Sequence, residues 1–89
     1  NEVARTVIEE AGYGKNFFHR LGHGIGIDVH EPPFLAPGDT TVLQSGMCFT
    51  VEPSIWVSGK CFTRVEDVVL VTEAGGVNLN TATHDILVL

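Results

Sequence analysis

Basic side chains are scarce in this 89-residue chain, which has five Lys and Arg against eleven Asp and Glu and a formal net charge of −6 at pH 7. Nucleic-acid binding needs clustered Lys and Arg to neutralise phosphates, and the five basic residues form no cluster. The chain also lacks a run of about 18 apolar residues, the length that crosses a bilayer. We therefore expect neither nucleic acid nor a membrane among its partners.

Cysteine is equally sparse, with Cys48 and Cys61 as the two examples. They lie at unequal distances from a predicted hairpin turn at Ser58–Lys60, so they should not face each other across that hairpin. We expect two reduced thiols and a cytoplasmic protein.

What is present is typical of one small α+β domain, with 44% apolar and 18% charged residues. An apolar stripe at helical spacing predicts a helix over Asn1–Gly12, with glycine as its stop signal. Two prolines make Glu31–Phe34 extended and keep it out of a central ladder. From Met47 onward the composition favours strands. These strands are expected at Met47–Pro53, Ser54–Val57, Cys61–Thr72, Val77–Leu79 and, at the end of the chain, Ile86–Leu89.

The segment His19–Glu31 reads HRLGHGIGIDVHE and carries three histidines at spacings of four and seven residues. Glycines at 22, 24 and 26 weaken a helix and a strand, which indicates that the backbone approaches something closely. Three imidazoles in such a segment suggest a metal ion with its substrate. Hydrogen-bonded structural histidines are the alternative.

Two glutamates lie within the expected strands, Glu52 and Glu66. A carboxylate in a covered strand is costly unless it is paired or binds a metal. Strand alternation places Arg64 and Glu66 on one face and Asp67 on the other. An Arg64–Glu66 ion pair and a local salt bridge of Glu52 are the alternatives. Together with a Gly-flanked histidine, the two carboxylates favour an incomplete metal-hydrolase site, because a His–Glu–Glu set suits Mn, Co, Fe or a hydrolytic Zn.

Three ordered blocks, HRLGHGIGIDVHEPP (His19–Pro33), MCFTVEPSIW (Met47–Trp56) and TRVEDVVLVTEAG (Thr63–Gly75), resemble the C-terminal part of the pita-bread metallopeptidases. Within that family they are most similar to the prolidase and Xaa-Pro aminopeptidase branch. The resemblance implies that residues 1–89 are the C-terminal half of such a catalytic domain. One N-terminal helix would pack there on a curved antiparallel sheet.

The resemblance also implies a metal centre. His23 would be the imidazole ligand of one ion, Glu52 would bind the same ion, and Glu66 would bridge two divalent ions, most often Mn or Co, with Zn possible. The ions would activate a bridging water that attacks the peptide bond preceding proline. The glutamate near that water would take its proton.

Further residues acquire roles from the same resemblance. His30 would contact the substrate and stabilise the tetrahedral intermediate, and His19 would line the pocket near the substrate's proline. Arg64 would orient the acidic ligands. Two aspartate ligands belong to the preceding half of the domain, which this chain lacks. We therefore expect the isolated chain to bind metal weakly and to be catalytically inert, and we expect the protein to form a homo-oligomer because apolar surface is left uncovered.

The sequence departs from the family pattern at a few positions. Ser54 replaces the usual glycine of VEPG, Thr63 stands where glycine is commoner, and Trp56 replaces a tyrosine. Three alternatives stay open beside the prolidase and aminopeptidase branch. They are a methionine aminopeptidase, a non-peptidase of the same fold such as a creatine-type amidinohydrolase or a binding module, and an unrelated β-rich domain with structural histidines.

Overall fold

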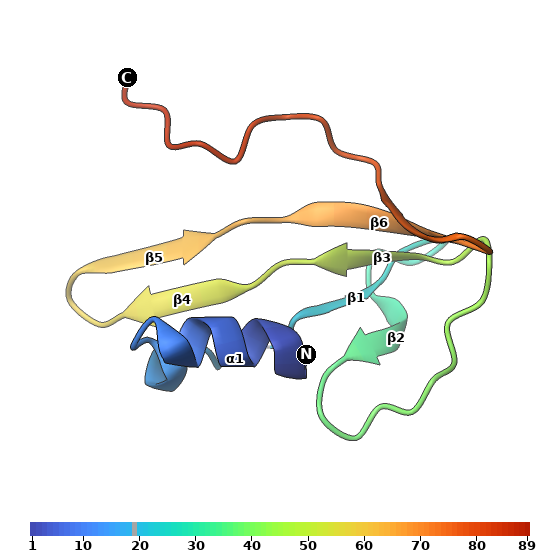
Figure 1. Cartoon of the computed structure of the whole chain (residues 1–89), viewed down its shortest axis with the longest axis horizontal. Helices are drawn as coiled ribbons and strands as arrows, with labels where there is room; N and C mark the ends of the chain where they lie inside the picture. Colours follow the sequence, from blue (N-terminus) through green and yellow to red (C-terminus); the bar gives the residue numbers. More distant parts are fainter. Residues whose placement is uncertain (19) are drawn as a thin grey trace.

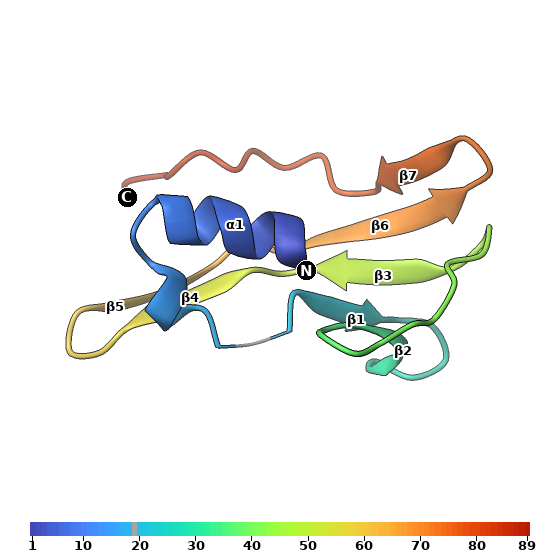
Figure 2. The ribbon, with the colours of Figure 1, turned by 60° about the horizontal axis from the view of Figure 1, so that its bottom comes forward.

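The computed structural model describes residues 1–18 and 20–89. Helix α1 (Glu2–Glu10) is followed by the short 3₁₀ helix η1 (Gly14–Asn16), and both lie beside strand β4 (Figures 1 and 2). The helix buries Ile8, and its Arg5 guanidinium lies 4.9 Å from the centroid of the buried Phe17 ring. The predicted helix is confirmed, but it ends before Gly12, which has φ of 89°.

The strands of the described part form two antiparallel sheets. Strands β2, β1, β3, β6 and β7 make the larger sheet in that order, and β4 pairs with β5 in the smaller one. The α+β architecture with an antiparallel sheet is as expected. The strands are β1 (Gly22–Gly24), β2 (Glu31–Leu35), β3 (Cys48–Val51), β4 (Ser54–Val57), β5 (Cys61–Arg64), β6 (Asp67–Thr72) and β7 (Gly75–Asn78).

The two sheets are joined by one long hairpin whose register never shifts. Val51 pairs with Asp67 in the larger sheet, and Ser54 pairs with Arg64 in the smaller one, so the same pairing continues across the gap. The expected single strand over residues 61–72 is wrong, because it divides into β5 and β6. The break lies opposite Pro53, which has no amide proton for a ladder and accepts one bond, from the Val65 amide at 3.4 Å.

The edges of the larger sheet explain the outcome of two further expectations. Strand β2, with its two prolines, lies at one edge and so stays outside the central ladder as predicted. The expected strand over residues 86–89 is wrong, since this stretch has no strand structure and its four apolar side chains are at least 73% exposed. Figure 1 shows the C-terminal segment running back along the molecule apart from the ribbon of strands. Strand-forming residues need a partner edge, and this segment pairs with none in the described structure.

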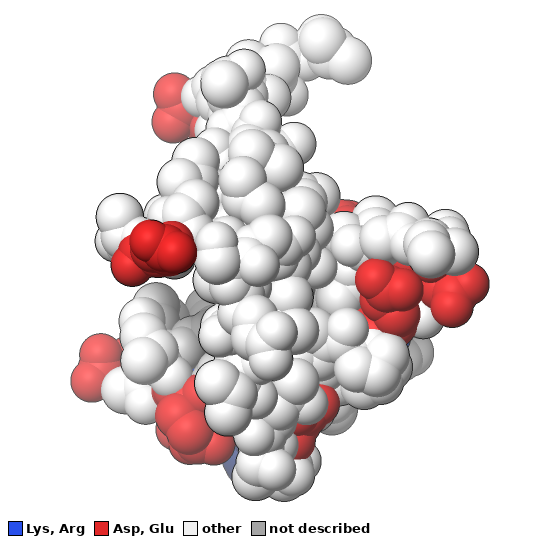
Figure 3. Space-filling view, turned by 90° about the vertical axis from the view of Figure 1, so that its right-hand side faces the viewer, with Lys and Arg blue, Asp and Glu red and all other residues white. Residues whose placement is uncertain are grey.

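Charge on the surface follows the composition. In the view of Figure 3, Asp and Glu side chains lie around the margins, and the centre of that face is uncharged. No helix in the described ranges has the length and apolarity needed to cross a membrane. The two cysteines are free thiols, as predicted, with Cys48 partly buried and Cys61 exposed.

Candidate metal centre

Strand β1 fits between β2 and β3 because two of its residues have no side chain. A Cβ added at Gly22 would collide with the Thr50 carbonyl oxygen of β3, and one at Gly24 would collide with the Pro32 and Glu31 carbonyl oxygens of β2. The expectation of a close backbone approach is therefore confirmed. At these two glycines the backbone approaches neighbouring strands, whereas the sequence had suggested that it approaches a metal ion with its substrate.

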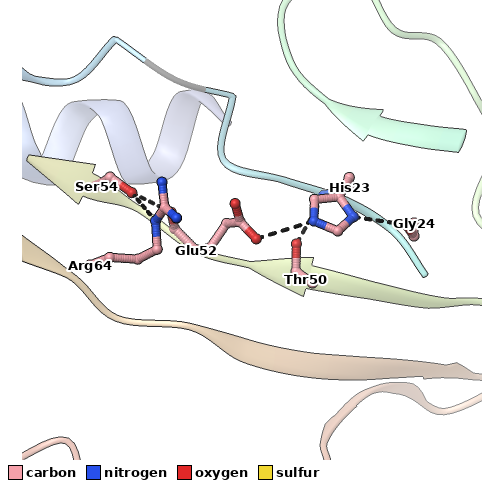
Figure 4. Close-up of polar contacts among 6 residues, drawn as sticks. All are labelled: His23, Gly24, Thr50, Glu52, Ser54 and Arg64. Atoms are coloured by element: carbon pink, nitrogen blue, oxygen red, sulfur yellow. Dashed lines mark hydrogen bonds and ion pairs between the residues drawn. The ribbon is translucent and has the colours of Figure 1, made fainter. Parts of the chain in front are cut away.

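This tight packing buries His23 to 4% exposure in the middle of β1. The His23 amide donates a hydrogen bond to Thr50 Oγ1 at 3.1 Å, and Thr50 is itself only 1% exposed. On the ring, Nδ1 lies 2.8 Å from the Gly24 carbonyl oxygen, and Nε2 lies 3.3 Å from Oε2 of Glu52 (Figure 4). The backbone and the ring of His23 are thus both fixed by neighbours.

The contact at Nδ1 determines what Nε2 can do. A carbonyl oxygen only accepts hydrogen bonds, so Nδ1 must carry the proton that joins it to Gly24. In a neutral imidazole, Nε2 then presents a lone pair to the Glu52 carboxylate, which is also an acceptor. Two acceptors at this distance need a proton or a metal cation between them. A histidine that donates its other ring nitrogen to a backbone carbonyl is the usual arrangement of a metal ligand.

Glu52 is held at three points. Its amide donates to the Leu21 carbonyl oxygen at 2.7 Å, its carbonyl oxygen accepts from Ser54 Oγ at 3.1 Å, and its carboxylate faces His23. The side chain is 16% exposed, so the carboxylate is largely but not completely buried. The partner is 29 residues away in sequence, so this contact joins two distant segments of the chain.

Glu66 occupies the position that faces Glu52. The constant register between Val51–Asp67 and Ser54–Arg64 places residue 66 opposite residue 52, and directly opposed residues of an antiparallel pair share one face. Glu66 is nonetheless exposed, and no group of three His, Cys, Asp or Glu side chains in residues 1–18 and 20–89 is close enough to hold a metal. The structure brings together two of the three proposed ligands.

The other predicted residues are placed as follows. The His30 ring lies 4.2 Å from the His23 ring, centroid to centroid, at an interplanar angle of 50°. Arg64 donates from Nε to Ser54 Oγ at 2.6 Å and is not ion-paired with Glu66 in the described structure, so that alternative is wrong. His19 lies outside the described residues.

Residues that the sequence did not single out complete the surroundings. Thr50 holds the His23 amide, and its position two residues before Glu52 on one strand could have identified it as a neighbour on the same face. A cavity of about 300 Å³ is lined by Arg64 and Glu66 together with His84, whose Nε2 lies 3.0 Å from Asp67 Oδ2. Nothing in the spacing of the C-terminal segment indicated that His84 would lie there.

The donors present fit a divalent cation of borderline hardness. An imidazole nitrogen and a carboxylate oxygen, both largely buried and facing each other, suit Mn, Fe, Co or Zn. They provide half of a four-coordinate shell, so further ligands must come from elsewhere.

The sequence and fold place the chain in a known class of proteins. Residues 1–73 match metallopeptidase family M24, and the chain belongs to that family. It is 52% identical over 73 residues to an Xaa-Pro dipeptidase of Lactobacillus delbrueckii subsp. lactis, a match that covers 82% of the chain and 20% of that protein. It is 46% identical over 87 residues to the probable dipeptidase PepE of Mycobacterium tuberculosis (strain ATCC 25618 / H37Rv), covering 98% of the chain and 23% of that protein.

Solved structures show the same relationship at the level of the fold. The chain superposes with a TM-score of 0.92 on a dipeptidase from Pyrococcus horikoshii OT3, at 46% identity, covering 97% of the chain and 24% of that structure. An X-Pro aminopeptidase from Thermotoga maritima MSB8 gives a TM-score of 0.92 at 43% identity, covering 99% of the chain and 25% of that structure. The expected pita-bread peptidase fold is confirmed. The chain spans about a quarter of the length of these relatives.

Proposed function

We propose that this chain supplies one wall of the active site of a longer metallopeptidase that cleaves Xaa-Pro bonds. The observation that carries the proposal is the buried pair in which His23 Nε2 faces Glu52 Oε2 at 3.3 Å while Nδ1 is held by the Gly24 carbonyl. Two similarities support the substrate class, because relatives named Xaa-Pro dipeptidase and X-Pro aminopeptidase match most of the chain.

In this proposal His23 and Glu52 bind one divalent ion, and Glu66 joins them when residues outside this chain complete a centre of two ions. Mn or Co is the proposed metal, with Zn as the alternative. The bound metals would polarise the scissile carbonyl and activate a water nucleophile. Residues 1–89 would form part of the catalytic domain, in a cytoplasmic homo-oligomer.

The chain's own side chains then have distinct tasks. Glu52 would accept the proton of the attacking water, for which its partly exposed carboxylate is suitably placed. His30, stacked at an angle on His23, would donate a hydrogen bond to the substrate oxygen as charge develops there. Arg64 would hold the acidic ligands in place, and His19 would line the pocket for proline.

Hydrolysis of Ala-Pro and of Ala-Ala by the full-length protein, after chelation and re-addition of Mn²⁺, tests the proposal. We expect Mn-dependent hydrolysis that favours Ala-Pro by at least about tenfold. We expect the 89-residue chain alone to be inactive, because its described residues bring only two of the proposed ligands together. Activity that survives complete chelation would contradict the metal assignment. An equal rate on both dipeptides would contradict the Xaa-Pro specificity, and an active isolated chain would contradict the statement that this site is incomplete.

A further inference from the structure

The hydroxyl of Ser54 connects two groups of the proposed site. It accepts a hydrogen bond from Arg64 Nε at 2.6 Å and donates one to the Glu52 carbonyl oxygen at 3.1 Å. Ser54 is 2% exposed, so its hydroxyl is largely shielded from water. Figure 4 shows the chain of contacts running from Arg64 through Ser54 to Glu52 and on to His23.

The Ser54 hydroxyl bonds to a carbonyl group at the point where the ladder of the long hairpin is interrupted. Residues 52–53 and 65–66 lie between the two sheets, where the regular ladder is interrupted. The Glu52 carbonyl therefore depends on a side chain for a partner. A hydrogen bond at the carbonyl fixes the peptide plane between Glu52 and Pro53, and with the amide held by Leu21 it limits the rotation of the Glu52 backbone.

We propose that Ser54 is a positioning residue that couples the Arg64 side chain to the Glu52 ligand through its hydroxyl. It touches neither the substrate nor the metal, and it acts by orienting the Glu52 backbone from which the carboxylate projects. The inference rests on the proposed function, because it takes Glu52 to be a metal ligand. Hydrogen bonds to a ligating side chain typically change metal affinity by 10–100-fold when they are removed, and a bond to the backbone of the ligand should have an effect at the low end of that range.

Glycine and alanine at this position separate a positioning role from a packing role. Ser54→Ala removes the hydroxyl and leaves a methyl group that keeps water out. Ser54→Gly leaves a space of roughly 30 Å³, enough for one water molecule that can bridge Arg64 and Glu52. The coupling role predicts that alanine weakens metal binding more than glycine does. A packing role predicts the reverse, because glycine removes more contacts and adds backbone entropy.

The experiment is calorimetric titration of the metal-free full-length protein with Mn²⁺ in a double-mutant cycle of Ser54→Ala and Arg64→Met. We expect Ser54→Ala to weaken Mn²⁺ binding by about tenfold and Ser54→Gly to weaken it less. When Arg64 is already Met, Ser54→Ala should have a clearly smaller effect, because the bond from Arg64 is then already gone and only the bond to the Glu52 carbonyl is removed. Ser58→Ala, in the exposed β4–β5 turn, is the matched control and should bind Mn²⁺ like the parent protein.

Each contrary outcome identifies what has failed. Any of three results would overturn the role of Ser54. Ser54→Ala could bind Mn²⁺ within twofold of the parent, or its tenfold loss of affinity could persist when Arg64 is Met. The third such result is a greater loss of affinity for Ser54→Gly than for Ser54→Ala. Glu52→Gln, titrated in parallel, tests the underlying assignment separately. If it binds Mn²⁺ as tightly as the parent, then Glu52 is not a ligand and the proposed function fails with it.

Discussion

Replacing Thr50 by valine should remove the hydrogen bond that fixes the backbone at His23. Thr50 Oγ1 accepts the His23 amide proton at 3.1 Å, and both residues are almost fully buried, at 1% and 4% exposure. Valine has nearly the same shape as threonine, so the exchange leaves no cavity but deprives a buried N–H group of its acceptor. An unsatisfied buried donor costs about 1–3 kcal/mol, and we expect a loss of about 2 kcal/mol.

Urea unfolding of the metal-free full-length protein measures this cost. The free energy of unfolding should fall by about 2 kcal/mol while the slope of its dependence on urea stays unchanged, so the midpoint should fall by that loss divided by the slope. Thr63→Val makes the same exchange at an exposed position of β5 and should change the free energy of unfolding by less than about 0.5 kcal/mol. If the two variants unfold at the same urea concentration, the hydrogen bond from the His23 amide does not support the site as we argue.

Three further changes test other parts of the structure. Glu52→Gln should weaken Mn²⁺ binding at least about tenfold in calorimetry, since a neutral amide is a poorer metal ligand, whereas Glu9→Gln on α1 should leave binding unaltered. Gly22→Ala should lower the free energy of unfolding in urea by about 3 kcal/mol, because its Cβ would collide with the Thr50 carbonyl oxygen. Gly76→Ala is the control and should lower it clearly less, because its Cβ would meet only a Val69 methyl group at 3.1 Å. Hydrogen bonds from Thr41 and from the Phe34 amide lower the pKa of Asp39 below its ordinary value of 3.8. Ionised Asp39 therefore stabilises the fold above pH 3.8, and this stabilisation is lost as the pH falls through the lower pKa of the folded state. Melting curves of the parent and of Asp39→Asn should therefore differ at pH 7 and converge at the acid end, and a constant difference would contradict this origin.

The local patterns that predicted the fold correctly were those set by neighbouring residues. The glycine at 59, with φ of 73°, turns the β4–β5 hairpin where Ser58–Lys60 predicted a turn, and the prolines of β2 kept that strand at an edge. The failures arose where tertiary pairing decides. Ile86–Leu89 has high strand propensity but no partner strand in the described structure, and the break between β5 and β6 depends on Pro53 in the facing strand.

The candidate site shows the same division. Residue type and the cost of a carboxylate in a strand indicated the histidine-rich segment and Glu52. The family resemblance then assigned His23 as the ligand, and the structure places His23 and Glu52 in contact. Thr50 and the hydroxyl network of Ser54 were not identified, because threonine and serine are common in strands and acquire a role only through the groups they face. Predicting that Glu66 lies opposite Glu52 would have required the register of the hairpin. The sequence alone did not give this register, because residues 61–72 were expected to form one continuous strand.

The most direct test of the central claim is a crystal structure of the full-length protein with Mn²⁺, in which anomalous scattering locates the metal. We predict a manganese peak between the two side chains, within about 2.0–2.3 Å of both His23 Nε2 and a Glu52 carboxylate oxygen. A site saturated with Mn²⁺ in which His23 and Glu52 still contact each other directly, with the metal bound elsewhere, would contradict the account.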